Sequence, residues 1–313
     1  MFRKSCILLP TDFSPYALHA MKYALAIAKA YEGRVHFLHV IDEALVSGGH
    51  AHGLWLTKGD ADALVASMKD HAGNRLEMLT RIADDQGVVC SSYTVVGKPQ
   101  DEILNHVRDH GCTLVVLATH GRSGFDHMVF GSVAEKVVRQ SPVPVLCIKH
   151  PEHEFVNDED LSLKIKRILF PTDFSPFADK ALPFAVSLCR EFHASLVLFH
   201  ASELSVALPE FMPDAALTIG TTMEATAREA LDRMKDSIED VEVEVAAVTG
   251  VPHREICRLV ERLPVDLIVM PTHGRSGIGH ILFGSVAEKV VRLAGCPVFT
   301  IRPEWEGPEP QAE

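Results

Sequence analysis

The chain has 313 residues, of which 47% are hydrophobic and 23% charged, and its formal net charge is −12. This length allows two ordinary domains with a core each, and the composition is typical of a soluble globular protein. The acidic balance argues against a broad nucleic-acid-binding surface, because contacts with a phosphate backbone need a basic face.

The cysteines and the amino-terminal residues indicate the cellular compartment. Seven cysteines are scattered along the chain, and none forms a C-x-x-C pair. This pattern predicts buried free thiols in a reducing compartment. The apolar run at 6–9 is too short for a signal peptide, and no later run approaches the length of a membrane span. We therefore expect a cytoplasmic protein without a membrane span.

The first half of the chain alternates apolar runs with segments of helical spacing. Ser14 and Pro15 have the residue types of an N-cap and a first helical position, so the first helix is predicted to begin there. Because strands and helices alternate and the strands are continuously apolar, we expect a doubly wound, Rossmann-like α/β domain. It would have five mostly parallel strands and helices on both faces. The predicted strands lie at 6–9, 34–41, 88–96, 113–119 and 143–149.

The second half of the chain repeats the first. The sequence PTDFSP occurs at 10–15 and again at 171–176, which is an offset of 161 residues. We therefore expect two equivalent domains with a linker between them and a disordered acidic tail. The predicted boundaries are 1–150 for the first domain, 151–164 for the linker, 165–303 for the second domain and 304–313 for the tail.

The most strongly repeated segment follows the fourth predicted strand. Residues 117–139 and 270–292 are identical at 17 of 23 aligned positions. Each copy has a glycine-containing turn and then a Gly-Ser pair at the start of a helix. Ser132 with Glu135, and their counterparts in the second copy, fit a capping box that would make the serine the N-cap. Backbone N–H groups at such a helix start suit a phosphate, although the same residues also fit a purely structural turn.

The segments that end the first, second and fourth predicted strands would meet at the carboxyl edge of the parallel sheet, where ligands bind in open α/β sheets. Asp12 could accept hydrogen bonds from a ribose hydroxyl or a base amine, or it could close an Asx turn. Val40 could form an apolar wall for a base. The Gly121 turn and the Gly131–Ser132 helix start could bind phosphates.

The arrangement resembles the universal stress protein family, and nearly all of both halves resembles two such domains in tandem. Nucleotide-binding members of that family carry G-x2-G-x9-G-[ST] after the fourth strand and an aspartate after the first. The spacing of the later glycines fits over 121–132 and again over 274–285.

The resemblance implies an adenine-nucleotide site in each half. It places Asp12 and Asp173 against the adenosine, Val40 and Ala201 beside the base, and the glycine-serine segments around the phosphates. The candidate ligand-binding residues are Thr11, Asp12, Val40, Ala118, His120, Gly121, Arg122, Gly131, Ser132 and Val133, with Thr172, Asp173, Ala201, Pro271, His273, Gly274, Arg275, Gly284, Ser285 and Val286.

Each half departs once from the family motif, at the position of its first glycine. Ala118 stands there in the first half and Pro271 in the second. Alanine adds one methyl group, whereas proline removes a backbone N–H and fixes φ, so any donation from that position is lost. We therefore place more weight on the first site. Arg122 and Arg275, beside the loops, could pair with a phosphate or simply be solvated.

The resemblance implies a stress-response protein that binds ATP or AMP, with Mg²⁺ or Mn²⁺ carried by the phosphates. Such a protein would act as a sensor or regulator towards a protein partner that the sequence does not identify. The two halves would pair through their last strands as an intramolecular pseudo-dimer, and a homodimer is a further expectation.

Fast phosphoryl transfer is not expected, because the chain lacks the P-loop motif G-x-x-x-x-G-K-[ST]. We therefore assign no catalytic residue. The alternatives to a sensor are a slow ATPase and a module whose pockets are empty or hold another ligand, such as a lipid or a metabolite.

Seventeen histidines raise the question of a metal site. His120 and His127 repeat as His273 and His280, but no histidine has zinc-ligand spacing with a cysteine partner. We therefore expect no dedicated metal site, and we expect His120 and His273 to form local hydrogen bonds.

Overall fold

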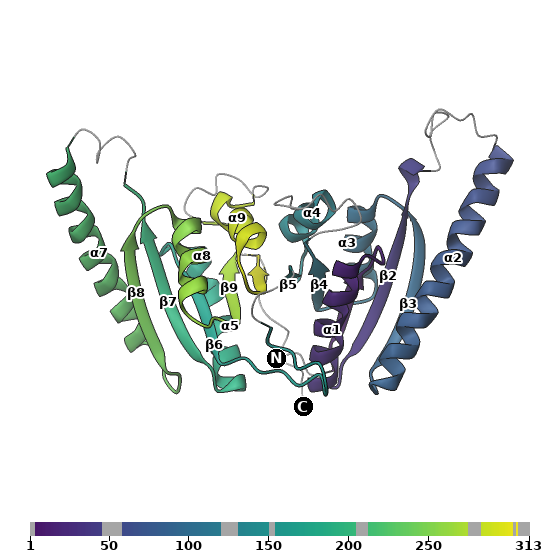
Figure 1. Cartoon of the computed structure of the whole chain (residues 1–313), viewed down its shortest axis with the longest axis horizontal. Helices are drawn as coiled ribbons and strands as arrows, with labels where there is room; N and C mark the ends of the chain where they lie inside the picture. The colour runs from purple at the N-terminus through teal and green to yellow at the C-terminus, as the bar shows by residue number, and fades with distance from the viewer. Residues whose placement is uncertain are drawn as a thin grey trace. The chain divides into compact units, whose positions relative to one another are not determined.

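The protein folds into two compact units. A computed structural model describes residues 4–45, 58–119, 131–149, 154–204, 212–274, 283–302 and 305. Figure 1 labels the elements of both units. Unit 1 contains Met1–Ile148 and Val156–Leu163, and unit 2 contains Lys149–Phe155 and Lys164–Gly307.

Unit 1 is a doubly wound α/β domain. Its strands lie in the order β3-β2-β1-β4-β5, and every neighbouring pair is parallel. The predicted fold class is therefore confirmed. The elements are β1 (Cys6–Pro10), α1 (Pro15–Ala30), β2 (Arg34–Asp42), the short 3-10 helix η1 (Glu43–Leu45), α2 (Lys58–Asp85), β3 (Val89–Gly97), α3 (Pro99–Asp109), β4 (Leu114–Ala118), α4 (Ser132–Gln140) and β5 (Val145–Ile148).

Unit 2 repeats this topology. Its strands lie in the order β8-β7-β6-β9-β10, again all parallel. The elements are β6 (Arg167–Pro171), α5 (Pro176–Phe192), β7 (Ser195–Ser202), α7 (Pro213–Asp236), β8 (Val243–Thr249), α8 (Pro252–Arg262), β9 (Leu267–Pro271), α9 (Ser285–Leu293) and β10 (Val298–Ile301).

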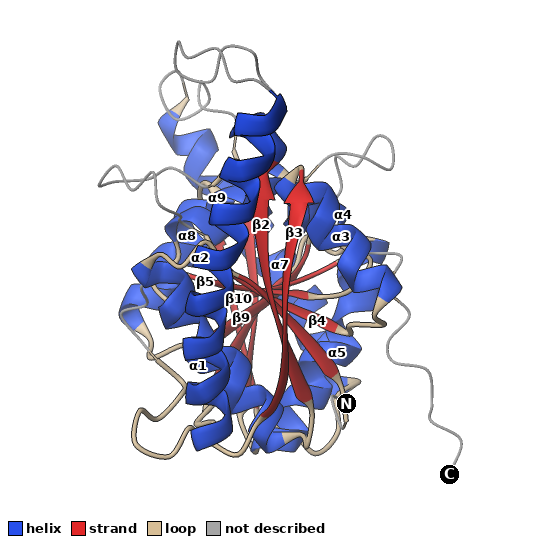
Figure 2. Ribbon diagram, turned by 90° about the vertical axis from the view of Figure 1, so that its right-hand side faces the viewer, coloured by secondary structure: helices blue, strands red, loops and turns tan. Residues whose placement is uncertain are grey.

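Helices cover both faces of each sheet (Figure 2). In unit 1, α1 packs on β1 and β4 and α2 packs on β2 and β3, while α3 and α4 pack against each other. Right-handed crossovers place α1 and α2 on one face and α3 and α4 on the other, because the chain reverses direction across the sheet after β3. The strands between these layers are buried from both sides.

Burial explains the pattern of apolar residues. Strands β1 and β5 are buried throughout, whereas the edge strand β3 is largely exposed or half-buried. Leu8 and Ile7 at the centre of β1 are completely buried. Each such side chain contributes about 1.5–3 kcal/mol on removal from water. The continuous apolar runs of the sequence therefore correspond to the central strands.

The first helix of each unit begins at the predicted cap. Ser14 Oγ accepts a hydrogen bond from the Ala17 N–H at 3.2 Å, and Pro15 is the first helical residue. Ser175 makes the same bond to the Ala178 N–H at 3.3 Å. These hydroxyl groups satisfy backbone donors that lack a partner inside the helix.

The predicted capping boxes of α4 and α9 are wrong. Gly131 and Gly284 are the N-caps, no side chain caps either helix, and the serines occupy the first helical position. The reason lies in the preceding strand, because the Gly131 N–H donates to Thr119 O at 3.0 Å. This bond places the glycine as the last residue before the helix.

The segment predicted as a linker includes a short hairpin that packs on unit 1. Val156 and Leu163 form an antiparallel bridge. Lys22 of α1 forms an ion pair with Asp158, and Lys29 donates to the Asp160 carbonyl at 3.2 Å. Two lysines of α1 thus contact this acidic segment, one through the Asp158 carboxylate and one through the Asp160 backbone carbonyl.

One residue of the predicted tail is described. The Trp305 ring packs edge-on against Phe184 of α5, with ring centroids 5.2 Å apart. This aromatic contact ties Trp305 to unit 2. The remainder of 304–313 lies outside the described residues.

The seven cysteines are free thiols. Burial raises the pKa of the Cys189 thiol to about 12, so this thiol is protonated and unreactive at neutral pH. In the described part of the chain, no helix is both long and apolar enough to cross a bilayer.

Candidate functional site

A crevice opens in each sheet where the strand order reverses. In unit 1, β1 pairs with β4 only at Ile7–Leu114 and Leu8–Val115, although both strands continue for further residues. The two strands diverge towards their carboxyl ends. This position is where open α/β sheets bind ligands.

The crevice of unit 1 forms a cleft with a volume of about 600 Å³. Clefts of this size hold small molecules. It combines an apolar wall with an aspartate and a helix start. The lining residues are Pro10, Thr11, Asp12, Ala17, Leu38, Val40, Asp42, Leu45, Pro99, Ile103, Leu117, Ala118, Thr119, Gly131, Ser132, Val133 and Ala134.

Asp12 lines the cleft and also shapes it. Its Oδ1 accepts a hydrogen bond from the Ser14 N–H at 2.9 Å, which closes an Asx turn. Thr11 Oγ1 accepts the Phe13 N–H at 3.0 Å in the same turn. The two readings of Asp12 are therefore compatible, because one carboxylate oxygen orders the turn while the side chain borders the cleft.

The start of α4 forms the opposite side of the cleft. The first helical hydrogen bond runs from the Glu135 N–H to Gly131 O at 2.9 Å. The N–H groups of Ser132, Val133 and Ala134 precede this bond and have no acceptor within the helix. With the positive end of the helix dipole, they give the cleft an edge that would suit an anion.

Gly131 lies where two backbone segments approach each other closely. A Cβ atom at this position would lie 3.3 Å from the carbonyl oxygen of Thr119, and at Gly284 it would lie 3.1 Å from that of Thr272. Any larger residue would push the helix start away from the strand end. The two glycines therefore hold the N–H groups close to the crevice.

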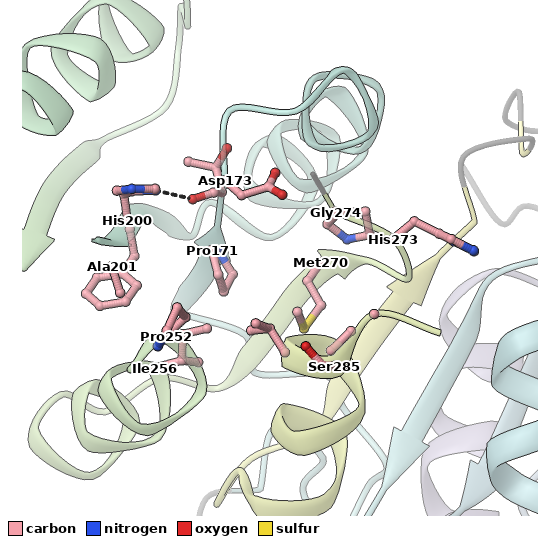
Figure 3. A pocket seen from close by; sticks show the side chains of 16 residues that line it. Pro171, Asp173, His200, Ala201, Pro252, Ile256, Met270, His273, Gly274 and Ser285 are labelled. Atoms are coloured by element: carbon pink, nitrogen blue, oxygen red, sulfur yellow. Dashed lines mark hydrogen bonds between the residues drawn. The ribbon is translucent and has the colours of Figure 1, made fainter. Parts of the chain in front are cut away.

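Unit 2 has an equivalent but smaller cleft, with a volume of about 130 Å³ (Figure 3). Phe199 and Met270 occupy the positions of Leu38 and Leu117. Phenylalanine at position 199 is larger than leucine at position 38, whereas methionine and leucine are similar in volume. The lining residues are Pro171, Thr172, Asp173, Phe199, His200, Ala201, Pro252, Ile256, Met270, Pro271, His273, Gly274, Gly284, Ser285, Val286 and Ala287.

Asp173 approaches Gly274 closely in this second cleft (Figure 3). A Cβ atom on Gly274 would lie 2.6 Å from Asp173 Oδ2. Asp173 Oδ1 accepts the Ser175 N–H at 3.0 Å, as its counterpart does in unit 1. The absence of a side chain at position 274 therefore makes room for the carboxylate.

Comparison of the whole chain with known proteins identifies its family. The sequence model described as the universal stress protein family matches residues 1–149 and 164–302. The chain belongs to the universal stress protein family. Its two matched ranges correspond to the two units, each with its own cleft.

Known universal stress proteins include relatives with the same tandem length. One from Synechocystis sp. is 26% identical over 314 residues, which covers 95% of this chain and 99% of the relative. A crystal structure of a universal stress protein from Archaeoglobus fulgidus has a TM-score of 0.68 and 24% identity, and it covers 96% of this chain and 97% of its own. This likeness shows the shared fold. A shorter solved universal stress protein, in complex with cAMP, has 25% identity over 45% of this chain and 98% of its own, with a TM-score of 0.33.

Most predicted site residues of this universal stress protein line the two clefts. In unit 1 these are Thr11, Asp12, Val40, Ala118, Gly131, Ser132 and Val133. In unit 2 they are Thr172, Asp173, Ala201, Pro271, His273, Gly274, Gly284, Ser285 and Val286. The remaining four, His120, Gly121, Arg122 and Arg275, lie outside the described residues. In unit 2, His273 Nδ1 lies 2.9 Å from Thr272 Oγ1, which is a local hydrogen bond of the predicted kind.

The two clefts differ at the strand end that precedes the loop. The Thr272 N–H donates to Ile301 O at 2.9 Å, on the side of β10. Consecutive N–H groups of a strand point to opposite sides, so position 271 faces the crevice. Pro271 offers no donor there, whereas Ala118 keeps its N–H. The donor set of the first cleft is the more complete one.

Two histidines that the sequence analysis did not select support the site. His39 Nδ1 bonds to Thr11 O at 2.8 Å, and its ring lies 4.5 Å from that of Phe13. His200 repeats both contacts in unit 2, at 2.7 Å to Thr172 O and 4.6 Å to Phe174. The repeat offset of 161 residues aligns the two histidines, and this signal could have identified them.

The apolar wall of the first cleft also includes residues that the sequence analysis did not assign to the site. Pro99 and Ile103 come from the start of α3, and Leu38 lies in β2 two residues before Val40. Pro252 and Ile256 are their counterparts at the start of α8. These positions are ordinary core positions in the sequence, so only the crevice shows that they border a ligand-sized space.

Proposed function

We propose that this universal stress protein binds an adenine nucleotide, ATP or AMP, in the cleft of unit 1. The observation that supports the proposal is the combination of three features around one cavity of about 600 Å³. They are a carboxylate on one strand end, an apolar wall on the next, and opposite them a helix start whose first N–H groups have no acceptor within the helix. A nucleoside phosphate has a group that could bind to each of these three features.

The adenosine would lie against Val40 and Leu38, with its ribose hydroxyls towards Asp12. Aspartate accepts hydrogen bonds from hydroxyl groups, and apolar side chains pack on the face of a base. The phosphates would lie at the start of α4, against the N–H groups of Ser132 and Val133. Mg²⁺ or Mn²⁺ would be carried by the phosphates.

The cleft of unit 2 would bind the nucleotide more weakly. Its volume is about 130 Å³, and Pro271 removes one donor from its rim. We infer that the protein acts as a cytoplasmic sensor or regulator whose contact with a protein partner changes with occupancy of the first cleft. Pairing of the two units through their last strands, and any homodimer, stay predictions of the family resemblance.

Calorimetric titration of nucleotide-stripped protein with Mg-ATP and with AMP tests the proposal. Asp12→Asn keeps Oδ1 for the Ser14 N–H but removes the negative charge. We expect it to weaken nucleotide binding at least about 10-fold, because a hydrogen bond to a charged group contributes roughly 1.5–3 kcal/mol. Asp173→Asn is the matched control and should leave the high-affinity site unchanged.

Two results would contradict the proposal. One is that the wild-type protein takes up neither nucleotide, and the other is an unchanged affinity in Asp12→Asn. The slow ATPase makes a different prediction. Phosphate release from ATP would follow the protein through purification and would stop in Asp12→Asn, and this result would establish an ATPase in place of a pure sensor.

A further inference from the structure

Unit 1 contains a cluster of cysteine and histidine side chains outside the nucleotide cleft. Cys6 Sγ and Cys112 Sγ lie 2.8 Å apart, and Cys112 Sγ lies 4.0 Å from His36 Nδ1. His36 Nδ1 lies 3.1 Å from His106 Nε2. Cys6, His36 and Cys112 form one group whose ligand atoms all lie within 4.8 Å of one another, and His36, His106 and His110 form a second.

The fold brings these residues together from four separate segments. Cys6 is the first residue of β1, His36 is the third of β2, and Cys112 lies two residues before β4. The Thr113 N–H donates to Cys6 O at 2.8 Å, which holds the residues before β4 against the start of β1. His106 lies in α3 and His110 is its C-cap, one helical turn later. The cluster therefore lies at the amino ends of the strands, opposite the nucleotide cleft.

The cluster is enclosed by the protein. The exposed fractions of Cys6 and Cys112 are 3%, that of His36 is 5% and that of His106 is 6%. His110 is exposed, and its ring stacks on His106 with centroids 4.0 Å apart. The Tyr93 ring closes another side of the group, 4.6 Å from His106. An ion could thus reach the buried donors past His110.

The fold itself does not require these side chains. At the equivalent positions of unit 2, the repeat offsets of 161 and 153 place Arg167, Val197, Leu259, Leu263 and Val265. Four of these five are apolar, and unit 2 has the same topology. Burying four polar or reactive groups in unit 1 is unfavourable unless something satisfies them. This contrast between the two repeats points to a function specific to unit 1.

The donor set suits a thiophilic cation. Thiolate and imidazole are the ligands of tetrahedral zinc sites, and soft sulfur ligands select against Mg²⁺ and Ca²⁺. Zn–S bonds of about 2.3 Å and Zn–N bonds of about 2.0–2.1 Å would space the donors roughly 3.3–3.8 Å apart. Within the group of Cys6, His36 and Cys112, the observed separations of 2.8 and 4.0 Å bracket this range, so small side-chain shifts would bring these three donors to one ion. His106 lies 3.1 Å from His36 and belongs to the second group only.

Metal binding requires the thiolate form of cysteine and the neutral form of histidine.

We propose that Cys6, His36 and Cys112 form a binding site for a thiophilic divalent cation, of which Zn²⁺ is the type, with His106 beside His36 at 3.1 Å. On binding, the thiol protons of Cys6 and Cys112 are released to solvent, and both sulfurs become thiolate ligands. The site is separate from the nucleotide cleft, so it does not depend on the function proposed above.

Cobalt titration of the untagged, full-length protein tests this proposal. The protein is reduced, stripped of metal and titrated with Co²⁺, whose thiolate charge-transfer and ligand-field bands report a tetrahedral sulfur-containing site. We expect one Co²⁺ per chain, displaced by Zn²⁺. The affinity for Zn²⁺ is then measured by competition with a chelator.

The matched variants install the residues of unit 2. Cys112→Val and His36→Val should weaken Co²⁺ binding more than about 100-fold, because loss of an outer-shell partner alone costs 10–100-fold. Cys112→Ser is a second variant, in case valine disturbs the packing, because serine is closer to cysteine in volume. It should show the same loss of Co²⁺ binding. Cys189→Ala removes a buried thiol of unit 2 and should leave the spectrum and stoichiometry unchanged.

Three results would overturn the proposal. The reduced wild-type protein could lack the thiolate band, or the band could persist in both Cys112 variants. The third result is a disulfide between Cys6 and Cys112, seen as a mass about 2 Da below that of the reduced chain, together with no Co²⁺ binding after reduction. The pair would then serve as a disulfide. Nucleotide affinity should be equal with and without Zn²⁺. The proposal of a nucleotide cleft and the proposal of a cation site can therefore fail independently.

Discussion

Phe13 and Phe174 have left-handed backbone conformations, with φ angles of 63° and 58°. Such angles are unfavourable for residues with a Cβ atom, by roughly 1–2 kcal/mol. The Phe13 ring offsets this cost, because it contacts both the His39 ring and the Arg75 guanidinium, each at 4.5 Å from the Phe13 ring centroid. The turn that carries Asp12 therefore has its conformation imposed by packing.

This strain predicts an unusual order of stabilities. Phe13→Ala loses the ring contacts and should lower the free energy of unfolding by about 3 kcal/mol. Phe13→Gly loses the same contacts but relieves the left-handed backbone, so it should be about 1 kcal/mol more stable than Phe13→Ala. Urea denaturation of the two variants measures the difference.

The control for this comparison is a buried helical residue of the same unit. Leu25 lies inside α1, and there Leu25→Gly should be less stable than Leu25→Ala by about 1 kcal/mol. If glycine were also the less stable substitution at position 13, the turn would not be strained.

At the scale of elements, two serines with similar sequence contexts have different tasks. Ser14 caps α1 with its hydroxyl group, whereas Ser132 is the first helical residue of α4 and caps nothing. The difference arises because Gly131 is tied to Thr119 by a backbone hydrogen bond. The serine of α4 is thus available to the cleft that it lines.

We expect the two serine variants to separate stability from binding. Ser14→Ala should lower the free energy of unfolding by about 1 kcal/mol, because a capping bond is lost. Ser132→Ala should change that free energy by less than about 0.5 kcal/mol, as surface substitutions do, and should weaken nucleotide binding. Thermal unfolding and calorimetric titration of both variants check this pairing. Equal losses of stability would mean that Ser132 does cap its helix.

At the scale of the whole molecule, each unit has a parallel sheet and a buried core of its own. Leu8 at the centre of β1 and Leu169 at the centre of β6 are equivalent, and both are completely buried. Trp305 packs on Phe184 of unit 2, so its fluorescence reports the state of that unit. The chain therefore contains a natural probe for one of its two domains.

This probe allows a test of whether the units unfold independently. In a Trp55→Phe background, Leu169→Ala should shift the Trp305 transition to lower denaturant, since truncating a buried leucine costs about 2–5 kcal/mol. Leu8→Ala should leave the Trp305 midpoint unchanged and shift only the part of the circular dichroism signal that comes from unit 1. Equal shifts of the Trp305 midpoint in both variants would show that the two units unfold as one.

The sequence by itself determined the order of strands and helices, the tandem repeat, and the strand ends that carry Asp12, Val40 and Gly131. These features follow from local periodicity and from residue types with strong backbone preferences, which act over a few residues. The repeat added evidence, since the same glycines and aspartates occur twice.

Only the tertiary structure decided which residues meet across long sequence distances. The cap of α4 depends on a bond to Thr119, and the two clefts differ in volume, at about 600 Å³ in unit 1 and about 130 Å³ in unit 2. His36 and Cys112 are 76 residues apart, so no local spacing could reveal the Cys/His cluster. The physical reason is that parallel strands joined by crossovers place the amino ends of distant segments side by side, and motif spacing along the chain does not record that proximity.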